Sequence, residues 1–245
     1  MAYQPDVGGR PVAVNPKIET DARVAAILTQ HTPAGGWFPV FRPYTPVHDR
    51  DERGTLQLLV KQYPNGKAST HLHSLSPGQT LTVRGPLPGY TWTPSASPRS
   101  VLFLAGGAGI TPVYSLTKGI LSNEADKTRI NIVWGVNGLR DIVLREELEQ
   151  LEAQHPDRLR VIYAVSGLDA QSNTTNSLDR DKYKNGHIDT RILQDAVQWC
   201  GKGSFGDETG KKVFLSGPPA MEEAIASKKG ILSELGIEKK AIHIF

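Results

Sequence analysis

A short apolar run that ends in a glycine-rich turn is the feature that most constrains how this chain can fold. Residues 100–105 are apolar from Val101 to Leu104, and they are followed by Gly106-Gly107-Ala108-Gly109-Ile110-Thr111-Pro112. An uninterrupted apolar run of this length is typical of a buried parallel strand. Glycines let backbone amides approach a pyrophosphate closely, and the start of a following helix favours its negative charge. The pattern predicts a strand, a nucleotide-binding turn and a helix over residues 112–121, with Thr111 as its cap and Pro112 as its first residue. Plain strand-to-helix packing remains the alternative, because the turn is not a G-x-G-x-x-G fingerprint.

Strands and helices alternate through the rest of residues 98–245. Further short apolar runs predict strands at residues 129–135, 160–165, 212–215 and 241–245. Amphipathic or capped segments predict helices at residues 141–154, 189–199, 221–228 and 231–235, the second of them capped by Asp189. Residues 166–184 are polar and are expected to form a loop. This alternation predicts an α/β domain built on a doubly wound parallel sheet.

Residues 1–97 follow a different pattern, typical of a small antiparallel β-barrel. Strands are expected at residues 23–30, 37–44, 55–63 and 80–85, with a short helix at 67–75 and a loop over residues 1–20. A loop rich in Pro, Ser and Thr at residues 90–98 marks the expected domain boundary. The sequence therefore predicts one domain over residues 1–97 and a second over residues 98–245.

Charge and cysteine content exclude several classes of function. The net charge of +3 lies in residues 1–97, which hold nine Lys or Arg and six Asp or Glu, whereas residues 98–245 hold nineteen of each. No basic run is interleaved with aromatic residues, so no nucleic-acid partner is expected. The single cysteine, Cys200, excludes an intramolecular disulfide and a cysteine-ligated metal cluster, and we interpret it as a packing residue. No stretch approaches the ~20 apolar residues of a membrane span, so none is expected in this chain.

The stretch Arg42-Pro43-Tyr44-Thr45 has the chemistry of a flavin site. Arginine is a fork-shaped donor that suits a phosphate, and tyrosine offers a flat ring and a hydroxyl. On a strand, Arg42 and Tyr44 share one face and Thr45 lies on the other. The alternative is an ordinary exposed strand that ends at Pro46.

Two further turns have the composition of ligand-binding turns. Gly66-Lys67-Ala68-Ser69-Thr70 places small and hydroxyl residues at the start of the expected helix, where a second pyrophosphate could bind. Ser216-Gly217-Pro218-Pro219-Ala220-Met221 follows the expected strand at 212–215, at the edge where doubly wound sheets bind ligands. A capped surface helix and a tight structural turn are the respective alternatives. His71 and His73 lack the companions of a metal site.

Taken together, these residues resemble the NADH–cytochrome b5 reductase family, within the ferredoxin-reductase-like flavoproteins, and most of all its fungal mitochondrial members. The resemblance runs from residue 23 to residue 245. The motifs that carry it are residues 41–46, 59–66, 68–72, 84–86, 106–112, 141–144 and 216–219 and the terminal Phe245.

The resemblance implies an enzyme that takes hydride from NADH onto FAD and passes electrons singly to cytochrome b5 or a similar haem protein, with NADPH as an alternative donor. It implies a mitochondrial location, at the outer membrane or in the intermembrane space. The residues implied to hold FAD are Arg42, Pro43, Tyr44, Thr45, Val60, Lys61, Tyr63, Gly66, Lys67, Ala68, Ser69 and Thr70. Those implied to hold the nicotinamide nucleotide are Gly106, Gly107, Ala108, Gly109, Thr111, Pro112, Asn137, Ser216, Gly217, Pro218, Met221 and Phe245. Thr45 and Ser216 are the implied catalytic residues, and Thr111 reaches both cofactors. Another acceptor, such as a quinone or a fused haem domain, and a redox-silent binding or assembly module remain alternatives.

Three departures from the family pattern qualify these expectations. Ser216 stands where the family usually has cysteine, which predicts slower hydride transfer with binding retained. Ser166 aligns where an acidic residue is typical, which weakens the expected preference for NADH over NADPH. Only 22 residues precede residue 23, about half of the usual length, which predicts an incomplete barrel with exposed strand edges.

Overall fold

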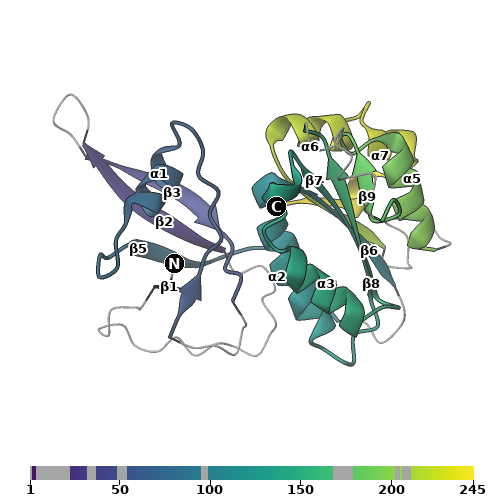
Figure 1. Ribbon diagram of the computed structural model, residues 1–245, viewed down its shortest axis with the longest axis horizontal. Helices are drawn as coiled ribbons and strands as arrows, with labels where there is room; N and C mark the ends of the chain where they lie inside the picture. Colours follow the sequence, from purple (N-terminus) through teal and green to yellow (C-terminus); the bar gives the residue numbers. More distant parts are fainter. Residues whose placement is uncertain are drawn as a thin grey trace. The chain divides into compact units, whose positions relative to one another are not determined.

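The computed structural model describes residues 2–3, 23–31, 37–48, 54–94, 99–167, 179–201, 205 and 211–245. The chain divides into two compact units, one of residues 1–93 with Tyr114–Leu116 and one of residues 94–113 with 117–245 (Figure 1). The loop expected at residues 1–20, the stretch before residue 23 on which the expectation of an incomplete barrel rests, and most of the loop expected at 166–184 lie outside the described residues. The exception in the first stretch is strand β1 (Ala2–Tyr3).

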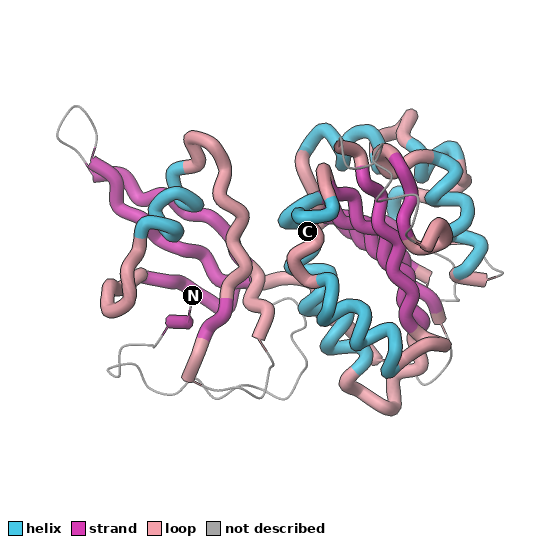
Figure 2. The backbone as a smooth tube through the Cα atoms, in the orientation of Figure 1, coloured by secondary structure: helices cyan, strands magenta, loops and turns pink. Residues whose placement is uncertain are grey.

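The second unit is built on a six-stranded sheet whose strands are all parallel, in the order β11-β10-β6-β7-β8-β9 (Figure 2). The strands are β6 (Ser100–Gly106), β7 (Arg129–Val136), β8 (Leu159–Val165), β9 (Tyr183–Asn185), β10 (Lys212–Ser216) and β11 (Ile242–Ile244). Every residue of β6 is buried, as its apolar sequence predicts for a central parallel strand. The predicted doubly wound parallel sheet is thereby confirmed.

Helices cover both faces of this sheet (Figure 1). They are α2 (Ile110–Leu121), α3 (Arg145–Gln154), α5 (Thr190–Trp199), α6 (Pro219–Ala226) and α7 (Ile231–Glu234), with short 3-10 turns η1 (Gly107–Gly109), η2 (Leu139–Asp141) and η4 (Lys239–Ala241). On one face, Leu193 of α5, Ile225 of α6 and Leu232 of α7 pack in a single cluster with Leu104 and Ile162 of the sheet. Burying these apolar side chains is the main source of stability for the unit.

Two expectations for this unit were wrong in detail. The helix expected from residue 141 begins only at Arg145, because the Asp141 carboxylate accepts a hydrogen bond from the Gly138 N–H and closes η2. The polar segment 166–184 was expected to be a loop, but its last residues begin β9, whose Tyr183 is buried against Tyr163.

The first unit is antiparallel in its described part, as predicted. Strands β2 (Arg23–His31), β3 (Trp37–Tyr44) and β5 (Thr82–Leu87) form a three-stranded sheet in the order β3-β2-β5, and β1 pairs with β4 (Leu56–Gln57). Helix α1 (Lys67–Ser74) agrees with the expected helix and packs Ala68 and Leu72 into a small core with Leu81. The expected strand at 55–63 was too long, because pairing ends after the bridge from Leu58 to Pro46.

Cys200 is a buried packing residue, as expected. Its side chain is 3% exposed, in the core cluster formed by α5, α6 and α7, and burial raises the pKa of its thiol to about 11. The thiol therefore stays protonated and unreactive at neutral pH. Within the described ranges, no helix is long and apolar enough to cross a membrane, and no group of three or more His, Cys, Asp or Glu side chains could hold a metal ion.

The cap of α5 gives the first testable prediction. As expected, Asp189 is the N-cap, and its Oδ1 accepts a hydrogen bond of 2.8 Å from the Ile192 N–H. Asp189→Ala removes this acceptor, so we expect the free energy of unfolding to fall by about 1 kcal/mol. Urea denaturation measures the change, and Asp189→Asn, which retains a capping oxygen, is the control. Equal stability of the alanine variant and the native protein would contradict the prediction.

Candidate functional site

Two turns meet at the carboxyl edge of the parallel sheet in the second unit. Strand β6 pairs with β10 so that Ala105 lies opposite Ser216, and the turns that follow both strands are in close contact. A Cβ atom on Gly109 would lie within 3.0 Å of the Ser216 backbone, and one on Gly106 or Gly217 would lie within 3.0 Å of the Met221 sulfur. Gly109 is therefore required by the close approach of the two turns, because the atoms it would meet are main chain.

The glycine turn contains η1, which runs directly into α2. Gly107 has a φ of 51°, which favours glycine, and α2 begins at Ile110 with Gly109 as its N-cap. The expectation that Thr111 caps the helix was wrong, because Thr111 lies within its first turn and its Oγ1 donates to the Ala108 carbonyl at 3.2 Å. No side chain caps this helix. The Ile110 N–H donates to carbonyls of η1, so the first N–H groups of this continuous helical run are those of Gly107–Gly109, and they have the arrangement that binds phosphate at a helix start.

Trp134, on the sheet, forms a hydrogen bond to the glycine turn and was not predicted from the sequence. It lies on β7 with 1% of its surface exposed, and its Nε1–H donates to the Gly107 carbonyl at 3.0 Å. A buried indole N–H needs a partner, and here that partner is the turn itself. A single tryptophan in an apolar strand forms no local motif, so no sequence pattern could have identified it.

The other residues expected at the nicotinamide site end on the same edge of the sheet. Asn137 is exposed directly after β7, and Ser216 is half-buried at the end of β10. The Phe245 N–H donates to the Leu215 carbonyl at 3.0 Å, and its ring stacks on Phe214 with centroids 5.7 Å apart. The structure thus brings residues 106–112, Asn137, residues 216–221 and Phe245 to one edge, where parallel sheets bind ligands.

In the first unit, the expected flavin residues lie at the end of β3. Arg42 is exposed, and its Nη1–H donates to the Phe41 carbonyl at 2.7 Å. Tyr44 packs on the small core, and burial raises the pKa of its hydroxyl, an effect that the Arg42 charge opposes. Thr45 is 6% exposed. Arg42 and Tyr44 are two positions apart on β3, so the strand period puts their side chains on one face.

The segment before α1 is bound to the first turn of that helix. Ser69 Oγ donates to the Gly66 carbonyl at 3.3 Å and accepts from the Tyr63 N–H at 3.2 Å. Gly66 is the N-cap without a side-chain bond, and the first turn has no acidic residue but does contain Lys67. This helix start can also receive an anion.

The other expected flavin residues lie on β3, on α1 or in the segment before it. Val60 packs on the small core, and its carbonyl lies 2.9 Å from His73 Nε2. Lys61, Pro43 and Thr70 are exposed, Ala68 is buried, and Tyr63 keeps 50% of its surface exposed. An exposed tyrosine ring three residues before a helix start that can receive an anion offers a flat surface for an aromatic ring system.

Comparisons with known proteins agree with a flavin site in the first unit and a nucleotide site in the second. The profile of the Oxidoreductase FAD-binding domain family matches residues 27–92, and that of the Oxidoreductase NAD-binding domain family matches residues 103–227. The NADH-cytochrome b5 reductase 2 of Pyricularia oryzae is 38% identical over 90% of this chain and 65% of its own length. That of Emericella nidulans is 37% identical over 90% of this chain and 67% of its own length. The chain therefore spans about two thirds of the length of these relatives.

A solved structure shows the same fold. The cytochrome b5 reductase domain of Ulva prolifera nitrate reductase superposes with a TM-score of 0.72 at 29% identity, over 91% of this chain and 83% of that domain. The CS-b5R domains of human Ncb5or, at 22% identity and a TM-score of 0.67 over 91% of this chain and 59% of that protein, share the fold.

Proposed function

Because this chain belongs to the NADH–cytochrome b5 reductase family and carries its FAD-binding and NAD-binding domains, we propose that it is an FAD-dependent reductase. It takes hydride from NADH and passes electrons one at a time to cytochrome b5 or a similar haem protein. The observation that carries the proposal is the start of the glycine turn η1, which no side chain caps, set against the Ser216–Gly217 turn at the carboxyl edge of the sheet. A mitochondrial location is part of the proposal and is supported by the family resemblance alone.

The first domain, proposed to span residues 1–97, has the groups that FAD requires. Arg42 offers a guanidinium fork to a phosphate, and the start of α1 at Gly66 offers backbone N–H groups without competing acidic side chains. Tyr44 and Thr45 would help to hold the flavin, and Tyr63 would flank it. When bound, FAD supplies the hydride-accepting and one-electron chemistry, whereas the protein orients it.

The second domain, proposed to span residues 98–245, binds the nicotinamide nucleotide. The N–H groups of the glycine turn would hold its pyrophosphate, and Ser216 and Phe245, where β10 and β11 end, would hold the nicotinamide. Holding the ring in a reactive orientation is the main contribution that the chain can make to hydride transfer.

Ser216 gives a prediction about this step. A cysteine sulfur is larger and more polarisable than the serine oxygen, and so packs more closely on the nicotinamide ring. We expect Ser216→Cys to raise the rate of flavin reduction by NADH by roughly tenfold, about 1.4 kcal/mol in the barrier, with nucleotide affinity unchanged. Anaerobic stopped-flow absorbance measures the rate. Ser233→Cys, at an exposed position on α7, is the matched control, and an unchanged rate in Ser216→Cys would refute the assignment.

The proposed function is tested first by the visible absorption spectrum of the purified protein before and after anaerobic addition of NADH. We expect flavin bands at about one FAD per chain that bleach within seconds, and reoxidation by cytochrome b5. Rapid bleaching with reoxidation by a quinone but not by a haem protein would move the acceptor to the quinone class. A colourless protein that does not take up added FAD would reject the reductase and favour a redox-silent binding module.

A further inference from the structure

The register of the sheet places Trp134 beside the glycine turn. On β7 it lies opposite Ala105 of β6 and Tyr163 of β8. Paired residues of neighbouring strands project to the same face, so the indole lies on the face of Ala105, one residue before the turn begins. Leu104 and Val133 lie on the other face, in the core cluster with α5, α6 and α7.

The indole is held firmly in this place by other buried rings. Its ring centroid lies 6.0 Å from that of Tyr163, which in turn stacks on Tyr183 at 5.1 Å, and all three side chains are buried. Close packing of this kind keeps a side chain in one rotamer. The Nε1–H of Trp134 therefore has a fixed direction.

The glycine turn needs a support of this kind. Three of its residues 106–109 are glycine, and Gly107 has a φ of 51°. Glycine has more conformational freedom than any other residue, so the peptide planes of such a turn are weakly fixed by the turn itself. The sheet supplies a contact from outside the turn, in which Trp134 Nε1–H donates to the Gly107 carbonyl at 3.0 Å.

This hydrogen bond adds direction to a carbonyl that already has a partner. The Ile110 N–H also donates to the Gly107 oxygen, so the indole is its second donor. The peptide that joins Gly107 to Ala108 is trans and planar, so the Ala108 N–H points away from the carbonyl and from Trp134. That N–H is one of the first of the helical run, whose start no side chain caps.

From this arrangement we propose that Trp134 is a positioning residue for the nicotinamide nucleotide. Its indole N–H fixes the peptide between Gly107 and Ala108, so that the Ala108 N–H is aimed at the pyrophosphate. Trp134 acts through the turn, because its own side chain is buried. The inference rests on the proposed function, since that proposal places the pyrophosphate at this turn.

Trp134→Phe tests the inference, because it keeps an aromatic ring against Tyr163 and removes the donor. Calorimetric titration of the FAD-loaded full chain compares ADP-ribose, which carries the pyrophosphate of NADH, with adenosine, which carries no phosphate. We expect the variant to bind ADP-ribose about tenfold more weakly, the effect of one oriented hydrogen bond, and adenosine with native affinity. Anaerobic stopped-flow should show the loss in the affinity for NADH rather than in the limiting rate of flavin reduction, because the pyrophosphate is remote from the reacting ring.

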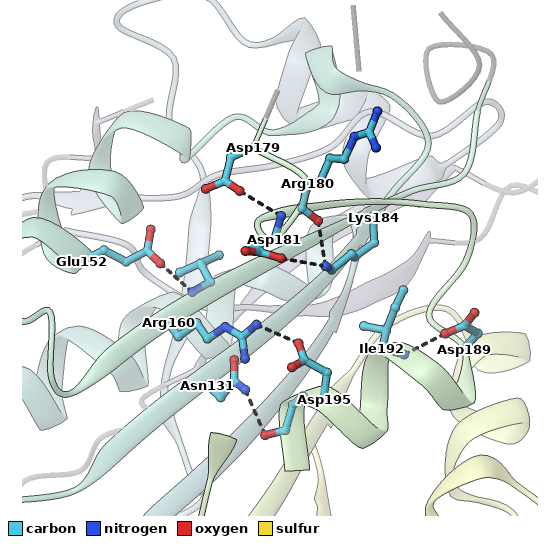
Figure 3. Close-up of polar contacts among 12 residues, drawn as sticks. Asn131, Glu152, Arg160, Asp179, Arg180, Asp181, Lys184, Asp189, Ile192 and Asp195 are labelled. Carbon is cyan, nitrogen blue, oxygen red and sulfur yellow. Dashed lines mark hydrogen bonds and ion pairs between the residues drawn. The ribbon is translucent and has the colours of Figure 1, made fainter. Parts of the chain in front are cut away.

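Asn131→Ala is the matched control for the loss of a buried hydrogen bond from β7. Asn131 is fully buried, and its Nδ2–H donates to the Ala196 carbonyl of α5, also at 3.0 Å (Figure 3). It lies three positions before Trp134 and therefore on the opposite face of the sheet. We expect this variant to lose stability in urea and to bind ADP-ribose and adenosine with native affinity.

The indole also gives a measurement that does not depend on the stability of a variant. Its proton–nitrogen NMR signal is identified as the one that Trp134→Phe removes. We expect the signal of the native chain to shift when ADP-ribose binds, because a phosphate bound to the Ala108 N–H polarises the Gly107 carbonyl of the same peptide. Adenosine should leave the signal in place.

The outcomes separate this inference from the proposed function. Native affinity for ADP-ribose in Trp134→Phe, or an indole signal that ADP-ribose leaves in place, would overturn the positioning role and leave the reductase proposal intact. Equal losses of ADP-ribose and adenosine in Trp134→Phe, or an equal loss of ADP-ribose in Asn131→Ala, would overturn it too, because either would indicate general damage to the sheet. Binding of neither fragment to the native protein would reject the nucleotide site itself, and with it both proposals.

Discussion

Replacing Gly109 by alanine is expected to slow flavin reduction by NADH by about 100-fold. The added Cβ would lie within 3.0 Å of the Ser216 backbone, a distance at which something must shift. The atoms that the Cβ would meet belong to the Ser216 main chain, which cannot rotate away as a flexible side chain can. The clash is therefore relieved by moving the glycine turn away from the end of β10. A displacement of about 1 Å between groups that orient a reacting pair costs about 100-fold in rate. Anaerobic stopped-flow measurements at several NADH concentrations give the rate and the affinity separately.

Gly236→Ala is the control for the general cost of this substitution. Gly236 has a φ of 72°, which an alanine adopts at a cost of about 1–2 kcal/mol, and no atom lies within 4 Å of its added Cβ. We expect this variant to lose stability in urea and to keep the native rate of flavin reduction. A Gly109→Ala variant that keeps both its rate and its nucleotide affinity would contradict the assignment of this turn to the nucleotide.

The parts of the fold that could be predicted are those whose sequence pattern lies within a few consecutive residues. A strand buried on both faces must be apolar throughout, so β6 and β10 stand out from the polar segments around them. The cap of α5 was also predictable, because the Asp189 carboxylate accepts its hydrogen bond from the Ile192 N–H, only three residues away. Local interactions of this kind are encoded within a few residues.

The parts that could not be predicted depend on contacts between distant residues. Strand β9 has three residues, too few for a period, and its Tyr183 is held by stacking on Tyr163 with ring centroids 5.1 Å apart. The start of α2 was placed two residues too late, because Thr111 and Pro112 are good residues for a helix start wherever they occur. The need for glycine at position 109 arises from Ser216, which is remote in the sequence.

In the candidate site, too, the residues with a local sequence pattern could be predicted and those that depend on distant contacts could not. The residues of each turn were named from local composition, and the structure gathers those of the second unit at one edge of the sheet. Trp134, which holds the glycine turn, was missed because its role exists only once β7 lies beside β6. The roles of the individual residues toward FAD and the nucleotide stay predictions, and those of Gly109 and Arg42 carry the largest expected effects.

Loss of the Arg42 guanidinium is expected to weaken FAD binding by roughly 100-fold. Arg42 is exposed on β3, and one of its five N–H donors is used by the Phe41 carbonyl at 2.7 Å, which fixes the direction of the fork. Hydrogen bonds from a guanidinium to a phosphate contribute about 1.5–3 kcal/mol, and about 2.7 kcal/mol corresponds to 100-fold in affinity. Arg42→Lys keeps the charge but loses the fork, so an intermediate loss of about tenfold is expected. Titration of the apoprotein with FAD, followed by flavin fluorescence, measures these affinities.

Arg84→Ala removes an equally exposed arginine from β5 of the same unit and is the matched control. If the contribution of Arg42 is a directed contact with phosphate, Arg84→Ala should bind FAD with native affinity. If both arginines act only through the general positive charge of the domain, the two variants should lose similar affinity, and high salt should abolish the difference from the native protein. An effect of Arg42→Ala that persists at high salt, together with a native Arg84→Ala, identifies the directed contact; native affinity in Arg42→Ala would refute it.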